Sequence, residues 1–179
     1  HWPTCNGEVI PRAPQVETLI EFTHRATSGL AFLSVLALFL WALRAFPKGH
    51  PARFGAGLAL FFMVTESLVG ASLVLFGWTA DNVSRERAVV QMVHLANTYF
   101  LLAALALTAW WASGGGPLRL RGQGALGLAL FLGLLALLFL GMSGAVTALG
   151  DLLFPVGSTL EALERSLTPG EHFLVRLRV

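Results

Sequence analysis

Four long apolar stretches constrain what this chain can fold into more than any other feature. They cover residues 21–46, 54–78, 88–112 and 124–149. With a helical rise of about 1.5 Å per residue, each can cross a hydrocarbon core of about 30 Å. We therefore predict an all-α integral membrane protein, a transmembrane helix bundle with four complete spans and the start of a fifth near Glu171.

The composition agrees with a membrane environment. Charged residues make up 12% of the chain and hydrophobic residues 55%, whereas soluble domains carry about 25% charged residues. The basic residues form no stripe with interleaved aromatic residues, so we expect membrane lipid and no nucleic acid as a partner. Because Cys5 is the single cysteine, a disulfide within these residues and a cysteine-only metal site are both excluded.

The basic residues of the loops predict the orientation, because such residues are enriched on the cytoplasmic side. The loops after the first and third stretches contain bases and no acid, whereas the other connections are richer in acids. We therefore expect a multi-pass protein of the cell (plasma) membrane with its N-terminal loop and Cys5 on the outer side. The bases of the two cytoplasmic loops are Arg44, Lys48, Arg53, Arg119 and Arg121.

Ionisable side chains within the spans are the best functional candidates, because they are costly in a membrane and face protein or a cavity. Glu21, His24 and Ser28 recur at i, i+3 and i+7, so they share one helix face. The third stretch has a similar polar stripe in an otherwise apolar sequence. The stripe contains Gln91, His94, Asn97 and Thr98. We infer that the two polar faces share an interior.

The expected depths of two histidines in the membrane suggest that they bind a common ligand. His24 and His94 would both lie in the outer half of the membrane, on different helices, with no acid or thiol cluster to complete a zinc site. Such a pair suits axial ligation of a flat apolar macrocycle such as haem. The alternative is that each histidine only forms a hydrogen bond across the bundle.

Other residues also carry two interpretations. Glu21 suits either acid/base chemistry or stabilisation of a helix N-terminus, and Arg25 suits either a haem propionate or the lipid headgroups. Glu66 suits either a packing hydrogen bond or a proton relay. Small residues let helices approach closely, which we expect at Gly133, Gly141 and Gly144.

Three groups of motifs resemble one known family. The run Trp2-Pro3-Thr4-Cys5-Asn6-Gly7, followed by Ile20-Glu21-Phe22-Thr23-His24-Arg25 and Ser28-Gly29, resembles the first half of haem A synthase. Gln91-Met92-Val93-His94-Leu95-Ala96-Asn97-Thr98 resembles the next haem-liganding helix of that family. Glu66, Gly70 and Phe76-Gly77 resemble the helix between them, so that the likeness covers residues 1–112.

The resemblance implies an architecture of two pseudo-repeated four-helix halves, of which this chain is a fragment lacking the first helix and most of the second half. Residues 1–20 would be an outer loop and residues 21–112 three helices of the first haem-binding half. Residues 113–123 would be a cytoplasmic loop. Residues 124–179 would be the first helix, outer loop and truncated second helix of the second half.

The resemblance also implies an activity, oxidation of the C8 methyl group of haem O to the formyl group of haem A for terminal oxidases. It makes His24 and His94 the axial ligands of a haem iron, with haem b as cofactor and haem O as substrate. It implicates Glu21 in the oxidation, with Arg25 beside the cofactor, and pairs Cys5 in a disulfide with a cysteine before His1.

The expected partners are an electron donor of unspecified identity, haem O synthase and a terminal oxidase. Two alternatives stay open at this stage. One is a b-type membrane cytochrome that carries electrons without modifying haem. The other is a transporter with a proton site at Glu66.

Overall fold

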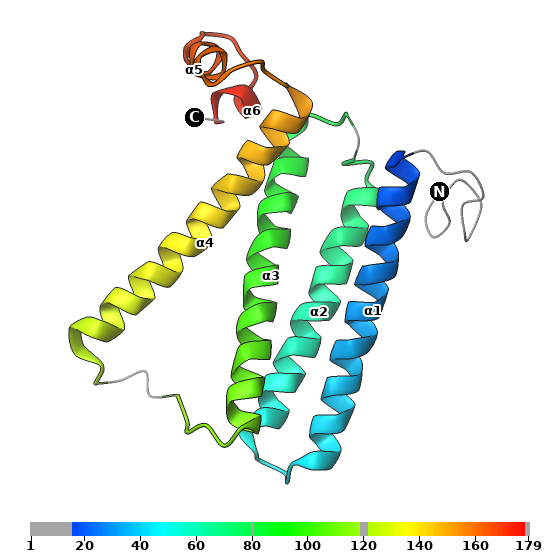
Figure 1. Ribbon diagram of the computed structural model, residues 1–179, viewed down its shortest axis with the longest axis vertical. Coiled ribbons are helices and arrows are strands. Elements are labelled where there is room, and N and C mark those ends of the chain that lie inside the picture. Colours follow the sequence, from blue (N-terminus) through cyan, green and yellow to red (C-terminus); the bar gives the residue numbers. More distant parts are fainter. Residues whose placement is uncertain (1–15, 80, 119–121, 178–179) are drawn as a thin grey trace. The chain divides into compact units, whose positions relative to one another are not determined.

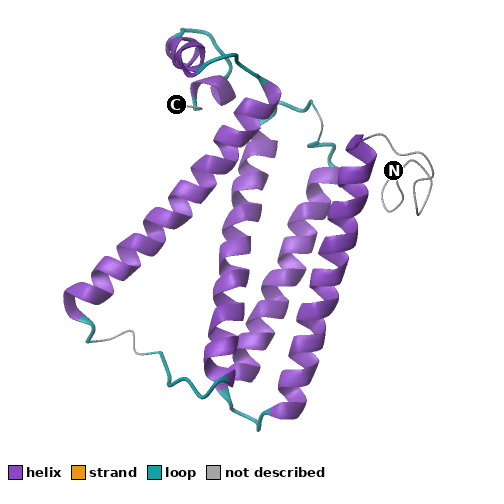
Figure 2. Ribbon diagram, in the orientation of Figure 1, coloured by secondary structure: helices purple, strands orange, loops and turns teal. Residues whose placement is uncertain are grey.

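The computed structural model describes residues 16–79, 81–118 and 122–177. Within them the chain forms helices and no strand (Figure 2). The long helices are α1 (Val16–Ala45), α2 (Pro51–Leu75), α3 (Arg85–Ala112) and α4 (Gly124–Leu153). The short helices are α5 (Thr159–Leu167) and α6 (Phe173–Arg176).

The four long helices confirm the predicted fold class. Each is long and apolar enough to cross a membrane. Their surfaces expose large apolar side chains, such as Leu33, Phe61, Leu102 and Phe139, in the way that surfaces facing lipid tails do. The chain is therefore a multi-pass membrane protein built from helices.

The end of α2 differs from its predicted position. The apolar stretch continues to Trp78, but the helix ends at Leu75. Gly77 has a φ of +68°, a left-handed conformation that glycine adopts readily. Its amide donates to the carbonyl oxygen of Val74 at 3.2 Å, and the amide of Trp78 donates to that of Leu73 at 2.8 Å. This pair of hydrogen bonds is a Schellman motif, which ends the helix before the apolar sequence does.

The predicted end of α3 at Ala112 is confirmed, and a second Schellman motif explains it. Gly114 has a φ of +85°. Its amide donates to the carbonyl oxygen of Trp111 at 3.2 Å, and the amide of Gly115 donates to that of Trp110 at 2.9 Å. The glycine run after the third stretch therefore ends the helix by satisfying its last carbonyl groups.

Three helices are longer than their apolar stretches. α1 begins at Val16 rather than residue 21, α3 begins at Arg85 rather than residue 88, and α4 continues to Leu153 rather than residue 149. Hydropathy locates the part of a helix that suits the hydrocarbon core, whereas backbone hydrogen bonding also continues through polar residues at the boundary, such as Thr18 and Asp151.

The chain divides into two compact units, which are described separately. The first comprises described residues within 1–67 and 101–116, so it contains α1, the first part of α2 and the last part of α3 (Figure 1). Ala52, Ala56 and Ala59 of α2 are completely buried. Because their side chains are small, the neighbouring helices of this unit approach the α2 backbone closely. The buried core cluster consists of Val35, Ala59, Met63, Leu101 and Ala104.

The second unit lies within residues 68–100 and 117–179. The expected close approach of helices occurs at Gly141, where a Cβ atom would lie 2.5 Å from the hydroxyl oxygen of Tyr99. Among the described residues no atom lies within 4 Å of a Cβ atom built at Gly133 or Gly144, so the same expectation is wrong there. The core cluster of this unit consists of Ala88, Val146, Leu149 and Leu174.

Helix α5 was not predicted, although the sequence carries a signal for it. The hydroxyl of Ser158 accepts a hydrogen bond from the amide of Glu161 at 3.2 Å. The carboxylate of Glu161 accepts one from the amide of Gly157 at 2.9 Å. The Ser-x-x-Glu spacing is typical of a helix N-terminus. Beyond α5, α6 begins at Phe173, close to the start predicted near Glu171.

Candidate functional site

The first group of predicted site residues lies near the N-terminal end of α1, in the first unit. Arg25 donates a hydrogen bond to the carboxylate of Glu21, one turn earlier on the same helix, and the two form an ion pair. This pairing was not predicted from the sequence. Its signal was the spacing, because an acid four residues before a base on a helix favours such a contact. The carboxylate is therefore held in a defined direction by Arg25.

His24 is exposed on the same helix. Its backbone carbonyl lies 3.0 Å from the hydroxyl of Thr27, which also donates to the carbonyl of Thr23 at 2.9 Å. Both contacts involve the backbone of α1, so neither occupies the imidazole. An exposed imidazole near the N-terminal end of a membrane-spanning helix is available to a ligand that binds against α1.

The second group surrounds His94 on α3, in the second unit. The imidazole is half-buried, and its Nδ1 atom is shielded from solvent. A Cβ atom built at Gly70 of α2 would lie 3.5 Å from both Nε2 and Cε1 of His94. Glycine at this position therefore leaves a space beside Nε2 that any other side chain would fill.

The surroundings of His94 can be compared with what a haem-liganding histidine requires. Histidine binds haem iron through one ring nitrogen, while the protein surrounds and orients the ring. The Nδ1 atom of His94 is buried in the protein. The ring edge that contains Nε2 lies against Gly70, which has no side chain. Nε2 therefore lies beside a position that carries no side chain, which is compatible with its use as a ligand nitrogen.

Gln91 lies one turn before His94. Its Oε1 atom is buried and accepts no hydrogen bond from any described residue. A buried amide oxygen without a donor is unusual in a folded protein. The polar stripe of α3 therefore retains an acceptor for a group not contained in the described residues.

The structure does not group the other candidates into a metal cluster. Within residues 16–79, 81–118 and 122–177, no three His, Cys, Asp or Glu side chains are arranged to hold a metal ion. Glu66 lies in α2 of the first unit and is half-buried. Cys5 and its expected disulfide lie outside the described residues, together with the Trp2–Gly7 motif.

Known proteins are similar to this chain in sequence. The family model described as "COX15-CtaA: Cytochrome oxidase assembly protein" matches residues 1–175. "Heme A synthase" of Exiguobacterium sibiricum is 47% identical over 75 residues, which are 42% of this chain and 25% of that protein. "Heme A synthase" of Halalkalibacterium halodurans is 43% identical over 76 residues, which are 42% of this chain and 26% of that protein. No solved structure matches.

A longer relative carries a different name. "Protoheme IX farnesyltransferase" of one strain of Thermus thermophilus is 99% identical over all 179 residues, which make up 29% of that protein. The corresponding protein of a second strain of this species matches to the same extent. The chain thus spans less than a third of the length of the curated relatives it matches.

Proposed function

The chain belongs to the COX15-CtaA family of cytochrome oxidase assembly proteins, and from this premise we propose that it is part of a haem A synthase. The proposed reaction oxidises the C8 methyl group of haem O to the formyl group of haem A. The observation that carries the proposal is the family match over residues 1–175. The proposed site residues Glu21, His24, Arg25 and His94 lie within this range. Relatives named "Heme A synthase" support it.

The farnesyltransferase name of the longer relatives does not contradict this proposal. The shared residues are only 29% of those proteins. Binding the diphosphate of a prenyl donor through Mg²⁺ calls for clustered carboxylates, whereas among the described residues no three His, Cys, Asp or Glu side chains are grouped so that they could hold a metal ion. We assign farnesyl transfer to the remaining part of those longer proteins. Haem O is farnesylated protohaem, so the assignment agrees with haem O synthase as a partner.

We propose that His24 and His94 would bind the iron of a haem b, that Arg25 would bind a propionate, and that haem O is the substrate. When bound, the haem supplies the capacity to exchange electrons at the site. Gly70 supports the assignment of His94, because it leaves space beside Nε2. With Nδ1 buried in the protein, Nε2 is the ring nitrogen that lies beside Gly70.

For Glu21 we propose a role at the methyl group that is oxidised. Its carboxylate either accepts a proton released from that carbon or stabilises positive charge that develops there. The ion pair with Arg25 orients the carboxylate and places the two charges on the same turn of α1. Breaking the pair should therefore disturb the acid and the propionate contact together.

We further propose the topology predicted from the loops. The N-terminal loop with Cys5 would face the outside, and Lys48, Arg53, Arg119 and Arg121 would face the cytoplasm. Residues 21–112 would belong to the first half of the family architecture and residues 124–179 to the second.

The test is haem analysis of cells that express the complete protein with a source of haem O. We expect haem A with the wild type, and none with His24→Ala, His94→Ala or Glu21→Gln. Glu164→Gln, which removes an exposed carboxylate on α5, is the matched control and should leave haem A unchanged.

Absence of haem A from cells with correctly folded wild-type protein would refute the synthase. A reversible b-type spectrum that disappears in His24→Ala, while the haem composition of the cells stays the same, would instead identify an electron carrier.

A further inference from the structure

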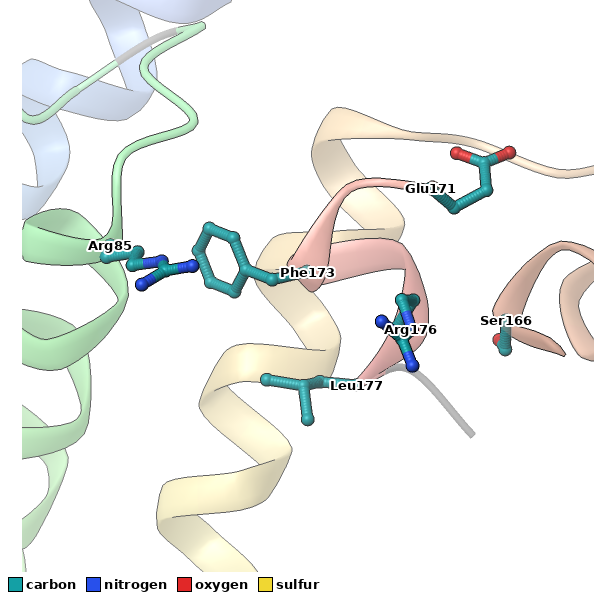
Figure 3. A pocket seen from close by; sticks show the side chains of 6 residues that line it. All are labelled: Arg85, Ser166, Glu171, Phe173, Arg176 and Leu177. Atoms are coloured by element: carbon teal, nitrogen blue, oxygen red, sulfur yellow. The ribbon is translucent and has the colours of Figure 1, made fainter. Parts of the chain in front are cut away.

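A pocket of about 440 Å³ opens in the second unit, between the start of α3 and the helices α5 and α6 (Figure 3). We propose that it binds the phosphate of a membrane phospholipid, with α5 resting on the lipid surface beside it. The pocket is lined by Arg85, Ser166, Glu171, Phe173, Arg176 and Leu177.

The charges of the lining favour an anion. Arg85 and Arg176 contribute two guanidinium groups from different helices. The single acid of the lining, Glu171, accepts a hydrogen bond from Nε of Arg165 at 3.0 Å and forms an ion pair with it. This hydrogen bond raises the pKa of Arg165 above its ordinary value. Because the charge of Glu171 is already balanced by Arg165, the two lining arginines leave the pocket positive.

The two arginines differ in their contacts. The guanidinium carbon of Arg85 lies 5.8 Å from the centre of the Phe173 ring, and Figure 3 shows the ring directed toward it. This cation–π contact holds Arg85 against the wall and leaves its N–H groups able to donate. Arg176 is exposed on α6. A phosphate has several oxygen atoms, and each guanidinium group offers it charge-assisted hydrogen bonds.

The position of the pocket favours a lipid over a soluble anion. Arg85 is the first residue of the membrane-spanning helix α3, and arginine at such an end reaches the headgroup region. Phe173 and Leu177 add an apolar wall to the charged one. A molecule that has a phosphate next to apolar chains matches both walls, whereas free phosphate matches only the arginines.

Helix α5 supplies an independent observation. Leu160, Leu163 and Leu167 recur at i, i+3 and i+7 and are 65%, 41% and 75% exposed. They form an exposed apolar stripe, which we call the leucine stripe. Ala162 and Ser166 lie on another face of α5 and are buried, with the Ser166 hydroxyl 3.1 Å from the carbonyl oxygen of Val175. A short amphipathic helix with an exposed apolar stripe next to a membrane span is typical of a helix that lies in the lipid interface.

The experiment measures lipid retained by the complete protein, purified in mild detergent, by native mass spectrometry after addition of phosphatidylglycerol. We expect the wild type to retain this lipid. The double variant Arg85→Gln/Arg176→Gln should retain about tenfold less phosphatidylglycerol, because each substitution removes charge-assisted hydrogen bonds. Arg44→Gln, which removes an exposed base in the last turn of α1, is the matched control and should behave as the wild type.

Two further variants test the effect of the pocket charge and the contribution of the leucine stripe. Glu171→Gln removes the acid of the lining and keeps both arginines, so retention should increase. The triple variant Leu160→Ser/Leu163→Ser/Leu167→Ser should weaken retention without changing the charge of the pocket. Circular dichroism confirms folding of each variant.

Three results would overturn the proposal. The first is equal retention by the double arginine variant and the wild type. The second is equal retention of uncharged diacylglycerol and phosphatidylglycerol. The third is displacement of the lipid by inorganic phosphate at equal concentration, because this would make the pocket a site for a free anion.

Discussion

Replacement of Gly55 by alanine should destabilise the first unit, and the structure gives the size of the effect. A Cβ atom at Gly55 would lie 2.6 Å from Oγ1 of Thr108, 3.1 Å from Cζ3 of Trp111 and 3.2 Å from Cα of Thr108. The threonine hydroxyl cannot easily turn away, because it donates to the carbonyl oxygen of Ala104 at 2.7 Å. The third of these atoms belongs to the backbone, so its crowding can be relieved only if the α2 and α3 segments of this unit move apart.

The magnitude follows from two opposing contributions. Inserting a methyl group into a packed core costs about 1–3 kcal/mol. Alanine in place of glycine within a helix contributes about 0.5–1 kcal/mol of stability. The difference between these contributions is about 0–2.5 kcal/mol. Because the new Cβ atom would meet neighbours at 2.6 and 3.1 Å, we expect the free energy of unfolding of Gly55→Ala to fall by about 1–2 kcal/mol. The loss should be larger if Trp111 cannot move.

The assay is the unfolding equilibrium of the complete protein in bilayer-like detergent, with Gly133→Ala as the matched control. Gly133 lies in α4, and no described atom would lie within 4 Å of its Cβ atom. The control should be neutral or slightly stabilising, since only helix propensity changes. If both variants are equally stable, the close contact at Gly55 is not a constraint and the reasoning fails.

Three other substitutions test separate features. Gly70→Ala should keep the fold, because 3.5 Å to His94 is an ordinary contact, but should lower the ratio of haem absorbance to protein severalfold; an unchanged ratio, matching Gly133→Ala, would show that the space is not used by haem. Ser158→Ala removes the cap of α5 and should reduce local stability by about 1 kcal/mol; hydrogen exchange of the α5 amides measures this, and unchanged exchange would contradict it. Gly150→Ala would place a Cβ atom 2.6 Å from the carbonyl oxygen of Leu174, so α6 should become protease-sensitive, and a cleavage pattern like the wild type would argue against that contact.

The membrane spans could be predicted from the sequence because they depend on a property summed over many residues. Apolar length alone identified all four long helices. Their ends depend on single residues, and only local rules locate them. Gly77 ends α2 before the apolar sequence does, so hydropathy placed that end three residues too late.

Contacts between helices were less predictable. Gly133, Gly141 and Gly144 looked equivalent in the sequence, yet among the described residues only Gly141 has a close neighbour. The difference depends on which face of α4 packs against α3 in the second unit, and this is a tertiary property. By contrast, the ion pair of Glu21 and Arg25 and the cap of α5 were local features that spacing could have identified.

Some features of the candidate site could be predicted from motifs and others could not. Glu21, His24, Arg25 and His94 were selected from the sequence motifs, and their roles stay predictions. The space beside His94 could not be predicted, because it is formed by the absence of a side chain at Gly70 on a different helix.

The small buried residues of α2 also determine how this helix can change during evolution or in the laboratory. Ala52, Ala56 and Ala59 have no exposed surface, whereas Phe54 and Phe61 of the same helix are 66% and 58% exposed. In saturation mutagenesis of α2, the tolerance to substitution should therefore vary along the sequence with helical periodicity. Positions on the buried face should reject every larger residue, and those on the exposed face should accept almost any apolar one. The volume of a side chain, rather than its hydrophobicity, would then be the property under selection on the inner face of α2.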